Sequence, residues 1–323
     1  MQTIEATYRI VTPMFIGGAD QKASDGIRPP SFKGALRFWW RALNWGKYHD
    51  LAKLHQREAE LFGSAVNNGK GGQGKFLLVV EQPRNLQPIS DWPNSHTARG
   101  ETSKSGYLGL GLFPMGEHKR REAIREGQMF TVTLRFCRDA VDADMDSVTQ
   151  ALKALGLFGG LGSRARRGFG SVALESLSGE ELAVSDLPDY QRQIEALFHS
   201  TVLAQELPPY TAFSKAMKVA LDNNSQADAR TAHSRAGNRY INHRGQPSSL
   251  RGVRKKWFGL PLVGVSDARR GSPLFFHIHP VGNKFTCLNL VMPTSEWLPG
   301  ESANAGAYRD VESFLDDLQE VRV

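Results

Sequence analysis

Residues 129–136 read MFTVTLRF, residues 144–158 read DMDSVTQALKALGLF, and residues 170–177 read GSVALESL. In the first segment apolar and polar residues alternate, which is typical of a half-buried strand. In the second segment apolar residues recur every three or four positions, which predicts a helix. The third segment again predicts a strand. A strand, a helix and a strand in this order form the closing half of a βαββαβ unit.

The residues that precede this stretch supply the opening half of the unit. Alternating apolar positions predict a strand at residues 2–11, and helices are expected at residues 32–45 and 51–62. Further strands are expected at residues 76–80 and 107–113. The resulting order, β-α-(α)-β-(β)-β-α-β, predicts an α+β protein with a ferredoxin-like (RRM-like) fold.

The second half of the chain predicts a degenerate copy of the same unit. A helix is expected at residues 189–204, a hairpin from residues 274–279 and 285–292, and a last helix at residues 308–318. We therefore expect two ferredoxin-like domains with long loop insertions. The boundaries predicted are residues 1–178 for the N-terminal domain and residues 179–323 for the C-terminal domain.

Two segments are expected to lack regular structure. Residues 82–105 are rich in Pro, Asn, Ser and Thr, which indicates a long irregular insertion. Residues 222–249 are polar and basic, so we expect a segment that is mobile or is ordered only by a partner.

Composition excludes several classes of protein. Apolar residues make up 40% and charged residues 23% of the 323 residues, as in ordinary globular proteins, so a fibrous or wholly disordered chain is excluded. No apolar run approaches the roughly 18–20 residues that span a bilayer, and the N-terminus does not resemble a signal peptide. Cys137 and Cys287 lack metal-ligand spacing. We expect a soluble cytoplasmic protein without a disulfide framework, bound metal or cofactor.

Basic residues are concentrated in three islands that contain no acid. The chain carries 40 Lys and Arg against 33 Asp and Glu, a net charge of +7. The islands are residues 26–49, 159–174 and 229–266. Such clustering is typical of an electrostatic footprint for a polyanion.

The first island forms one face of the helix expected after Pro29-Pro30, with Ser31 as its N-cap. At about 100° per residue, Lys33, Arg37 and Arg41 share a basic stripe that also contains Trp40. Trp39 lies on the opposite, apolar arc. Cations can neutralise phosphates, and an aromatic ring beside them can stack on a base, so this face predicts RNA binding. The alternative is the solvated face of an ordinary amphipathic helix.

The second island is a glycine-rich loop, residues 156–170. It lacks the GK[ST] of a phosphate-binding P-loop, and it joins a helix to a strand, the reverse of the dinucleotide-binding order. Glycine permits positive φ, so we expect a Cβ at Gly162 or Gly168 to block the close approach of a phosphate. The alternative is a helix C-cap followed by an exposed basic turn. The RNA contacts predicted in this loop are Gly162, Ser163, Arg164, Arg166 and Arg167.

The third island ends in a cluster of cations beside Trp257. Arg254, Lys255 and Lys256 precede this indole and combine charge with a stacking surface, which favours RNA contact. The alternative is a solvated basic linker.

Residues that could carry catalysis are few. His277 and His279 alternate on an expected strand but lack a third metal ligand nearby. His49 and His55 could act as a general base on an RNA 2′-OH, although they lie among ordinary surface residues. The run Asp142–Asp146 lacks the spacing of a calcium loop and instead suits a helix N-terminus. We therefore predict no catalytic residue and no metal ligand.

Longer motifs resemble a known family. Residues 12–20, TPMFIGGAD, and 28–41, RPPSFKGALRFWWR, resemble the first subunit of the Cmr (type III-B) CRISPR effector complex. The loop 159–170, GGLGSRARRGFG, is similar to that of the wider RAMP superfamily. FGLP at 258–261 and RRGSPL at 269–274 also suit this subunit.

The resemblance implies two ferredoxin-like domains and a non-catalytic subunit that holds the 3′ region of the guide RNA, with target RNA nearby and other Cmr subunits as partners. It implies that Lys33, Arg37, Arg41 and the loop arginines contact guide-RNA phosphates. The alternative that the residues leave open is a metal-independent endoribonuclease that processes precursor guide RNA.

Overall fold

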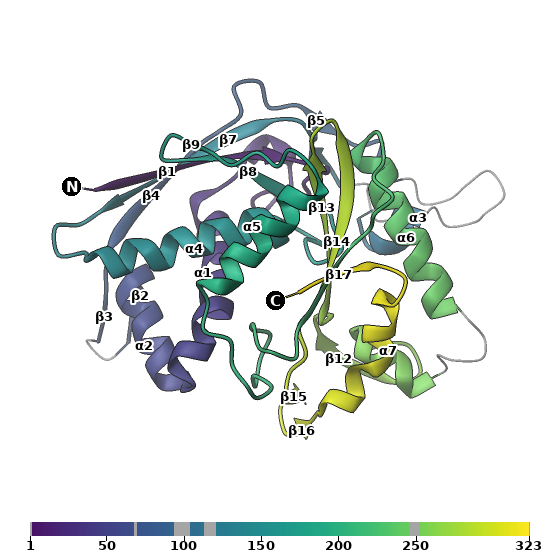
Figure 1. Ribbon diagram of the computed structural model, residues 1–323. Coiled ribbons are helices and arrows are strands. Elements are labelled where there is room, and N and C mark those ends of the chain that lie inside the picture. The colour runs from purple at the N-terminus through teal and green to yellow at the C-terminus, as the bar shows by residue number, and fades with distance from the viewer. Residues whose placement is uncertain (1, 68–69, 94–103, 113–120, 246–251, 323) are drawn as a thin grey trace.

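The computed structural model describes residues 2–67, 70–93, 104–112, 121–245 and 252–322. Within these ranges a five-stranded and a four-stranded antiparallel sheet are packed with helices, together with short two-stranded ribbons (Figure 1). The predicted α+β class is confirmed. In the described part of the chain no helix has both the length and the hydropathy that crossing a membrane requires.

The first sheet is built by the N-terminal half of the chain. Its strands follow the order β4-β7-β1-β8-β9, and each neighbouring pair is antiparallel. Along the chain, the main strands and helices follow the order β1-α1-β4-β7-α4-β8. This is the βαββαβ order, which is consistent with a ferredoxin-like arrangement. The elements are β1 (Thr3–Ile10), α1 (Pro29–Tyr48), α2 (Leu51–Phe62), β4 (Phe76–Glu81), β7 (Met129–Phe136), α4 (Asp142–Phe158), β8 (Val172–Leu177) and β9 (Glu180–Glu181).

The second sheet repeats this arrangement. Its order is β13-β14-β10-β17, so its first strand again lies between the third and the fourth, as in the first sheet. The helix α5 (Leu187–His199) precedes this unit. The elements of the unit are β10 (Lys218–Leu221), α6 (Ala229–Gly245), β13 (Leu274–Val281), β14 (Lys284–Val291), α7 (Arg309–Glu312) and β17 (Gln319–Val321). A boundary at residue 178 stays a prediction.

Short elements fill the connections. They are η1 (Ala23–Asp25), β2 (Ser64–Asn67), β3 (Lys70–Gly72), β5 (Pro88–Ile89), α3 (Lys104–Leu108), β6 (Ala123–Ile124), η2 (Gly252–Phe258), β11 (Leu260–Leu262), β12 (Ser266–Arg270), β15 (Glu296–Leu298), β16 (Glu301–Ser302), η3 (Ala305–Tyr308) and η4 (Ser313–Leu315).

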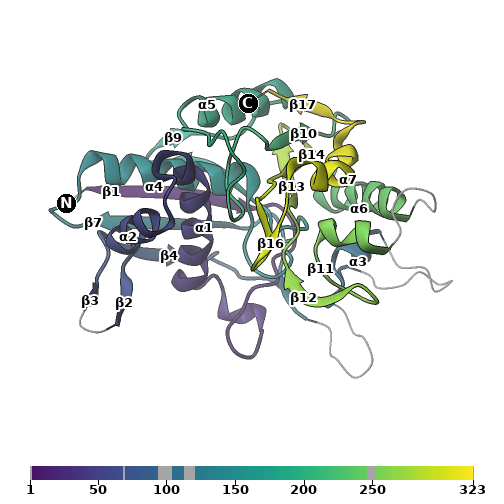
Figure 2. The same cartoon turned by 90° about the horizontal axis from the view of Figure 1, so that it is seen from below.

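The second sheet is covered on both faces, because successive side chains of a strand point to opposite sides. Phe276 of β13 packs in a core with Tyr240 of α6, whereas Phe275 stacks on Phe38 of α1. All eight residues of β13 are buried. Helices α1, α4 and α5 therefore lie between the two sheets, and α6 lies beyond the second one (Figures 1 and 2).

Two of the expectations for local structure were wrong. The strand predicted at residues 107–113 is replaced by the end of α3 and a turn, and its last residue lies outside the described ranges. The segment 222–249, expected to be mobile, contains α6; residues 246–249 lie outside the described ranges. Ala232, Ala236 and Tyr240 give α6 a narrow buried stripe, which polar neighbours conceal in the sequence.

Helix ends also differ from expectation. The N-cap of α1 is Arg28 rather than Ser31, and Pro29 and Pro30 occupy the first helical positions, where a missing N–H costs nothing. The last helix, expected at residues 308–318, is divided into η3, α7 and η4. Residues 82–93 contain only the two-residue strand β5, and residues 94–103 of the expected insertion lie outside the described ranges.

Candidate nucleic-acid interface

The basic face of α1 is partly covered by α2. Arg37 Nε donates to Glu58 Oε1 at 2.5 Å, and Arg41 Nη1 lies 3.2 Å from the same oxygen. The Glu58 side chain is only 2% exposed, so two half-exposed guanidinium groups neutralise one buried carboxylate. Lys33 lies over the ring of Phe76, and burial, with the nearby charge of Arg37, lowers its pKa.

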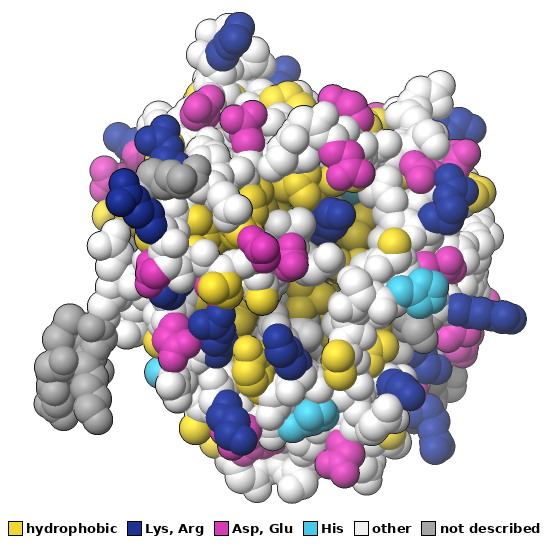
Figure 3. Space-filling view, turned by 60° about the vertical axis from the view of Figure 1, so that its left-hand side comes forward, with side chains coloured by type: hydrophobic (Ala, Val, Ile, Leu, Met, Phe, Trp, Pro, Cys, Tyr) yellow, Lys and Arg dark blue, Asp and Glu magenta, His cyan; other side chains and the backbone are white. Residues whose placement is uncertain are grey.

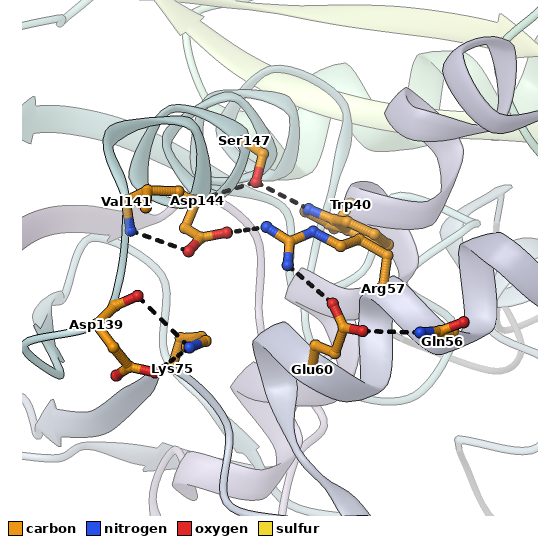
Figure 4. A network of polar contacts seen from close by, with 9 residues as sticks. All are labelled: Trp40, Gln56, Arg57, Glu60, Lys75, Asp139, Val141, Asp144 and Ser147. Carbon is orange, nitrogen blue, oxygen red and sulfur yellow. Dashed lines mark hydrogen bonds and ion pairs between the residues drawn. The ribbon is translucent and has the colours of Figure 1, made fainter.

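A polar network holds α2 in this position (Figure 4). Arg57 of α2 pairs with Asp144 at the start of α4 and, at 3.0 Å, with Glu60. The Asp144 carboxylate also accepts from Val141 N at 3.1 Å, which agrees with a role at a helix N-terminus. Helix α2 is therefore fixed against the helical layer.

The expectation that Trp40 belongs to an RNA-binding stripe was wrong. Its side chain is 1% exposed, meets Phe62 of α2 edge to face, and donates from Nε1 to Ser147 Oγ at 3.2 Å. A helical wheel places Trp40 next to the cations but cannot show that α2 and α4 close over it. Trp39 is 3% exposed, as its apolar arc predicts.

The glycine-rich loop joins the two sheets. Phe276 N of β13 donates to Arg166 O at 3.0 Å, and Ile278 N donates to Ser171 Oγ at 3.1 Å. His277 Nδ1 donates to Gly159 O at 2.8 Å. The loop is therefore a contact between the two halves of this chain, in addition to any ligand it binds.

Arg166 and Arg167 of the loop each hydrogen-bond to their own chain and lie over an aromatic ring. Arg166 donates to Ser272 O at 3.0 Å, and its guanidinium lies 4.6 Å from the ring centre of Phe275. Arg167 donates to Phe258 O at 2.9 Å and lies over Tyr240. Both are half-buried.

The other two polar residues of the loop also contact the chain. Arg164 is exposed and donates to Leu110 O. Ser163 Oγ accepts from Arg121 Nη1 at 2.8 Å. Arg164 is thus the loop arginine best placed for a partner outside the chain.

Gly162 and Gly168 have positive φ, as expected, but they lie close to other atoms of their own chain. A Cβ on Gly162 (φ +86°) would lie 2.5 Å from Phe15 O, and one on Gly168 (φ +78°) would lie 3.0 Å from the His233 ring. The expectation that such a Cβ acts by blocking a phosphate is therefore corrected, because it meets protein atoms first.

Gly162→Ala is expected to lower the free energy of unfolding by more than the cost of positive φ alone. Gly127 (φ +87°) is a matched control, because a Cβ there meets nothing within 4 Å. We expect Gly127→Ala to cost about 1–2 kcal/mol and Gly162→Ala a further 1–3 kcal/mol or so for the clash. Urea denaturation of both variants measures the difference. Equal losses would show that the contact with Phe15 relaxes freely.

In the folded structure, carboxylates from other parts of the chain lie next to cations of the third island. Arg254 forms a two-pronged pair with Asp310, with Nε 2.7 Å from Oδ2, and Lys256 Nζ lies 2.5 Å from Glu301 Oε1. Lys255 is half-buried. Carboxylates that lie 45 and 56 residues away in the chain therefore neutralise cations that seem isolated in the sequence.

One open cavity collects cations from separate islands. It has a volume of about 430 Å³ and lies where α1, α2, the glycine-rich loop and β12 meet. Arg41, Arg166 and Arg270 line it, with Glu58 as the one carboxylate among its lining residues. We call it the basic cavity. Its other lining residues are Phe38, Leu51, Leu54, His55, Tyr210 and Thr211.

The electrostatics of the basic cavity favour an anion. Burial lowers the pKa of Arg166 to about 10, and repulsion from Arg270 and Arg167 contributes. Arg270 donates to Thr294 Oγ1 at 3.1 Å. Within the described ranges neither Arg166 nor Arg270 has a carboxylate within 4.0 Å. A phosphate is an anion that such guanidinium groups recognise well.

Sequence reasoning did not single out Arg270 or Glu58. Arg269 and Arg270 belong to the motif RRGSPL, which contributed to the family resemblance but did not indicate a role for either residue. Glu58 is one acid within an ordinary amphipathic helix, so no local signal marks it as the partner of Arg37 and Arg41.

The sheets themselves do not offer an RRM-like binding surface. The first sheet has an open face, to which Thr7, Arg9, Thr133 and Glu175 belong; none of the described residues on that face is aromatic. RRM domains stack bases on aromatic side chains of such a face. The second sheet is buried on both sides.

The four histidines considered in the sequence analysis fall into two pairs. His277 and His279 are buried and linked to each other, with Nε2 of His277 3.1 Å from Nδ1 of His279. His49 ends α1 with φ +49°, and His55 lines the basic cavity. Nowhere in the described ranges do three His, Cys, Asp or Glu side chains gather as possible metal ligands.

Charges of both signs surround an apolar hollow on the face shown in Figure 3. Lys and Arg side chains alternate there with Asp and Glu side chains, so this face has no continuous basic surface. On this face, an interface for a polyanion is therefore local rather than continuous.

Two antiparallel sheets joined by a glycine-rich, arginine-bearing loop define a class of two-unit α+β proteins with a basic cavity near their junction. Residues 7–173 match the family model of the RAMP superfamily. The chain belongs to the RAMP superfamily.

Two curated relatives are CRISPR Cmr subunits. "CRISPR system Cmr subunit Cmr1-1" of Pyrococcus furiosus is 26% identical over 285 residues, 80% of this chain and 78% of that protein. Cmr1-2 of the same organism is 25% identical over 177 residues, 52% of this chain and 92% of that protein.

Solved structures share the fold. The crystal structure of apo Cmr1 from Pyrococcus furiosus has a TM-score of 0.69, with 22% identity and 99% of each chain covered. A chain in the cryo-EM structure of a type III-B Cmr-beta complex bound to cognate target RNA and AMPPnP, in the presence of ssDNA, has a TM-score of 0.60, with 12% identity and coverage of 97% of this chain and 98% of that one.

Proposed function

We propose that this protein is an RNA-binding subunit of a type III-B CRISPR effector complex, acting in the cytoplasm in antiviral defence. The similarity to Cmr1 subunits supports the assembly, and the Cmr-beta complex with target RNA supports RNA and other Cmr subunits as partners. The observation that carries RNA binding is the basic cavity, where three arginines face one carboxylate.

The chemistry of the cavity suits a phosphate of an RNA backbone. Arg166 is held in place by the rings of Phe38 and Phe275, so its guanidinium is positioned before a ligand arrives. Burial, and after it repulsion from Arg270, lowers the pKa of Arg166, so an anion bound between the two guanidinium groups would stabilise their charged forms. Exposed Arg164 and half-buried Lys33 extend the proposed contact surface.

The bound strand is proposed to be the 3′ region of the guide RNA, with target RNA passing nearby. We propose a positioning role without catalysis. His55 lines the basic cavity beside Arg41, so the alternative, metal-independent cleavage of precursor RNA, has one specific residue to test. Labelled precursor RNA incubated without divalent metal should stay intact. Cleavage that His55→Ala abolishes would replace the proposal with the endoribonuclease.

Arg270→Gln is expected to weaken RNA binding several-fold and to reduce the salt dependence. Removal of one phosphate contact on a single strand should change the log–log salt slope by about 0.7. Arg269→Gln is the matched control: it removes the same charge from the adjacent, exposed position on β12, which does not line the cavity. Fluorescence anisotropy at several salt concentrations gives both quantities.

Comparing the two variants distinguishes a specific phosphate site from nonspecific attraction by the net positive charge of the protein. We expect Arg269→Gln to keep the native slope and nearly the native affinity. Equal effects of the two substitutions would reduce the basic cavity to part of the overall positive charge. A wild-type protein that does not bind RNA would contradict the proposed function itself.

A further inference from the structure

A second cavity lies away from the basic one, between α4, α5 and the strands β8 and β13. Its volume is about 290 Å³, near the lower end of the roughly 300–1,000 Å³ typical of small-ligand sites. Its walls are mostly apolar, and Lys153 is the one Lys, Arg, Asp or Glu among its lining residues. We call it the His279 cavity. Its lining residues include Leu157, Leu174, Leu182, Ala196, Leu197 and His279.

Hydrogen bonds fix the tautomer of His279. Gly159 O can only accept, so His277 Nδ1, 2.8 Å away, carries the proton. Burial lowers the pKa of His277 to about 3 and that of His279 well below its usual value, so both rings are neutral. His277 Nε2 is then an acceptor, and Nδ1 of His279 donates to it at 3.1 Å.

This chain leaves Nε2 of His279 as an unprotonated acceptor. The side chain is 3% exposed, and within the described residues no protein donor pairs with that nitrogen. The ring lines the cavity, and its orientation is fixed by stacking on Tyr190, with centroids 4.1 Å apart and planes 13° apart. Nε2 of His279 is not one of the fully buried, unpaired side-chain atoms of the described residues, so water can reach it, and a ligand N–H group can take the place of that water.

We propose that the His279 cavity binds a neutral, planar heterocycle of nucleobase size whose N–H group donates to His279 Nε2. Apolar walls from Leu157, Leu174 and Leu197 suit the faces of such a ring. The carboxamides of Gln150 and Gln193, from α4 and α5, add hydrogen-bonding groups for its edge. An aliphatic ligand matches the walls but leaves the nitrogen unpaired.

Two nucleosides that differ in one donor provide the probe. Adenosine carries an exocyclic amino group, and purine riboside is the same molecule without it. We expect saturable binding of adenosine to the full chain, measured by isothermal titration calorimetry without RNA. Because bound purine riboside would displace water from Nε2 without supplying a donor, it should bind about tenfold or more weakly.

A cavity-filling variant tests the location. Leu182→Phe adds volume at a wall of the His279 cavity and leaves His279 unchanged, so adenosine binding should be lost. Leu187→Phe is the matched control, since Leu187 is also half-buried near the same core but does not line this cavity. Circular dichroism confirms that each variant folds. His279→Phe should likewise abolish binding.

Three outcomes would overturn the proposal: no saturable binding of adenosine, equal affinities for the two nucleosides, or equal effects of Leu182→Phe and Leu187→Phe. The proposal does not depend on binding of an RNA backbone. Because Arg270 does not line the His279 cavity, Arg270→Gln should leave adenosine affinity unchanged, so the failure of one proposal is distinguishable from the failure of the other.

Discussion

Replacement of Trp39 by alanine is expected to lower the free energy of unfolding by about 3–5 kcal/mol, as for other fully buried large aromatic side chains. The indole is 3% exposed and lies within 6.0 Å, centroid to centroid, of Phe158, Phe213 and Phe275. These rings belong to both halves of the chain. The variant leaves a cavity between α1 and the second sheet, so it weakens the junction as well as the helix.

Chemical denaturation followed by circular dichroism measures this loss. Leu51→Ala is the control, because Leu51 is 55% exposed on α2 and its truncation should change stability by about 0.5 kcal/mol or less. A loss below about 1 kcal/mol for Trp39→Ala would show that neighbouring rings collapse into the vacated space.

The double variant Arg37→Ala/Arg41→Ala is expected to destabilise the protein by about 3–5 kcal/mol, since removing the partners of a buried charge leaves that charge uncompensated. Glu58 is the charge concerned, and the described contacts show no other cation within 4.0 Å of it. The basic face of α1 therefore contributes to stability through Glu58 as well as to the proposed RNA contact. The melting temperature should therefore fall together with RNA affinity.

A third substitution distinguishes the cost of an unpaired buried charge from the cost of lost side-chain packing. Adding Glu58→Gln to the double variant removes the stranded carboxylate, so we expect it to recover a large part of the lost stability without restoring RNA affinity. A double variant as stable as the wild type would mean that water reaches Glu58 and solvates it. Thermal denaturation and anisotropy on the same three proteins decide between these results.

Much of the fold could be predicted from local patterns. Residues 129–136 and 51–62 form the strand and the helix that their periodicity indicates, because a period of two or of 3.6 residues reports which side of an element is buried. The hairpin of β13 and β14 was predicted from two apolar segments that flank the turn residues Gly282 and Asn283. Helix α6 was missed because its buried stripe consists mainly of alanine, which contributes little to a hydrophobic pattern.

The candidate site was less predictable than the fold. The sequence located the cations of α1 and of the glycine-rich loop, and the loop arginines that it indicated do lie beside a basic cavity. It could not show that Trp40 is buried by α2 or that Arg254 pairs with Asp310. Each of these facts depends on which distant element lies opposite a given side chain.

The sequence by itself determined the elements, their faces and the resemblance to a family, because backbone preferences and amphipathic spacing act over a few residues. Only the tertiary structure decided which cations gather at one site and which are neutralised by carboxylates from distant parts of the chain. Arg41, Arg166 and Arg270 meet in one cavity, whereas Lys256 is neutralised by a glutamate from another part of the chain. Coulomb interaction depends on distance in space, and the chain brings charges together that the sequence keeps far apart.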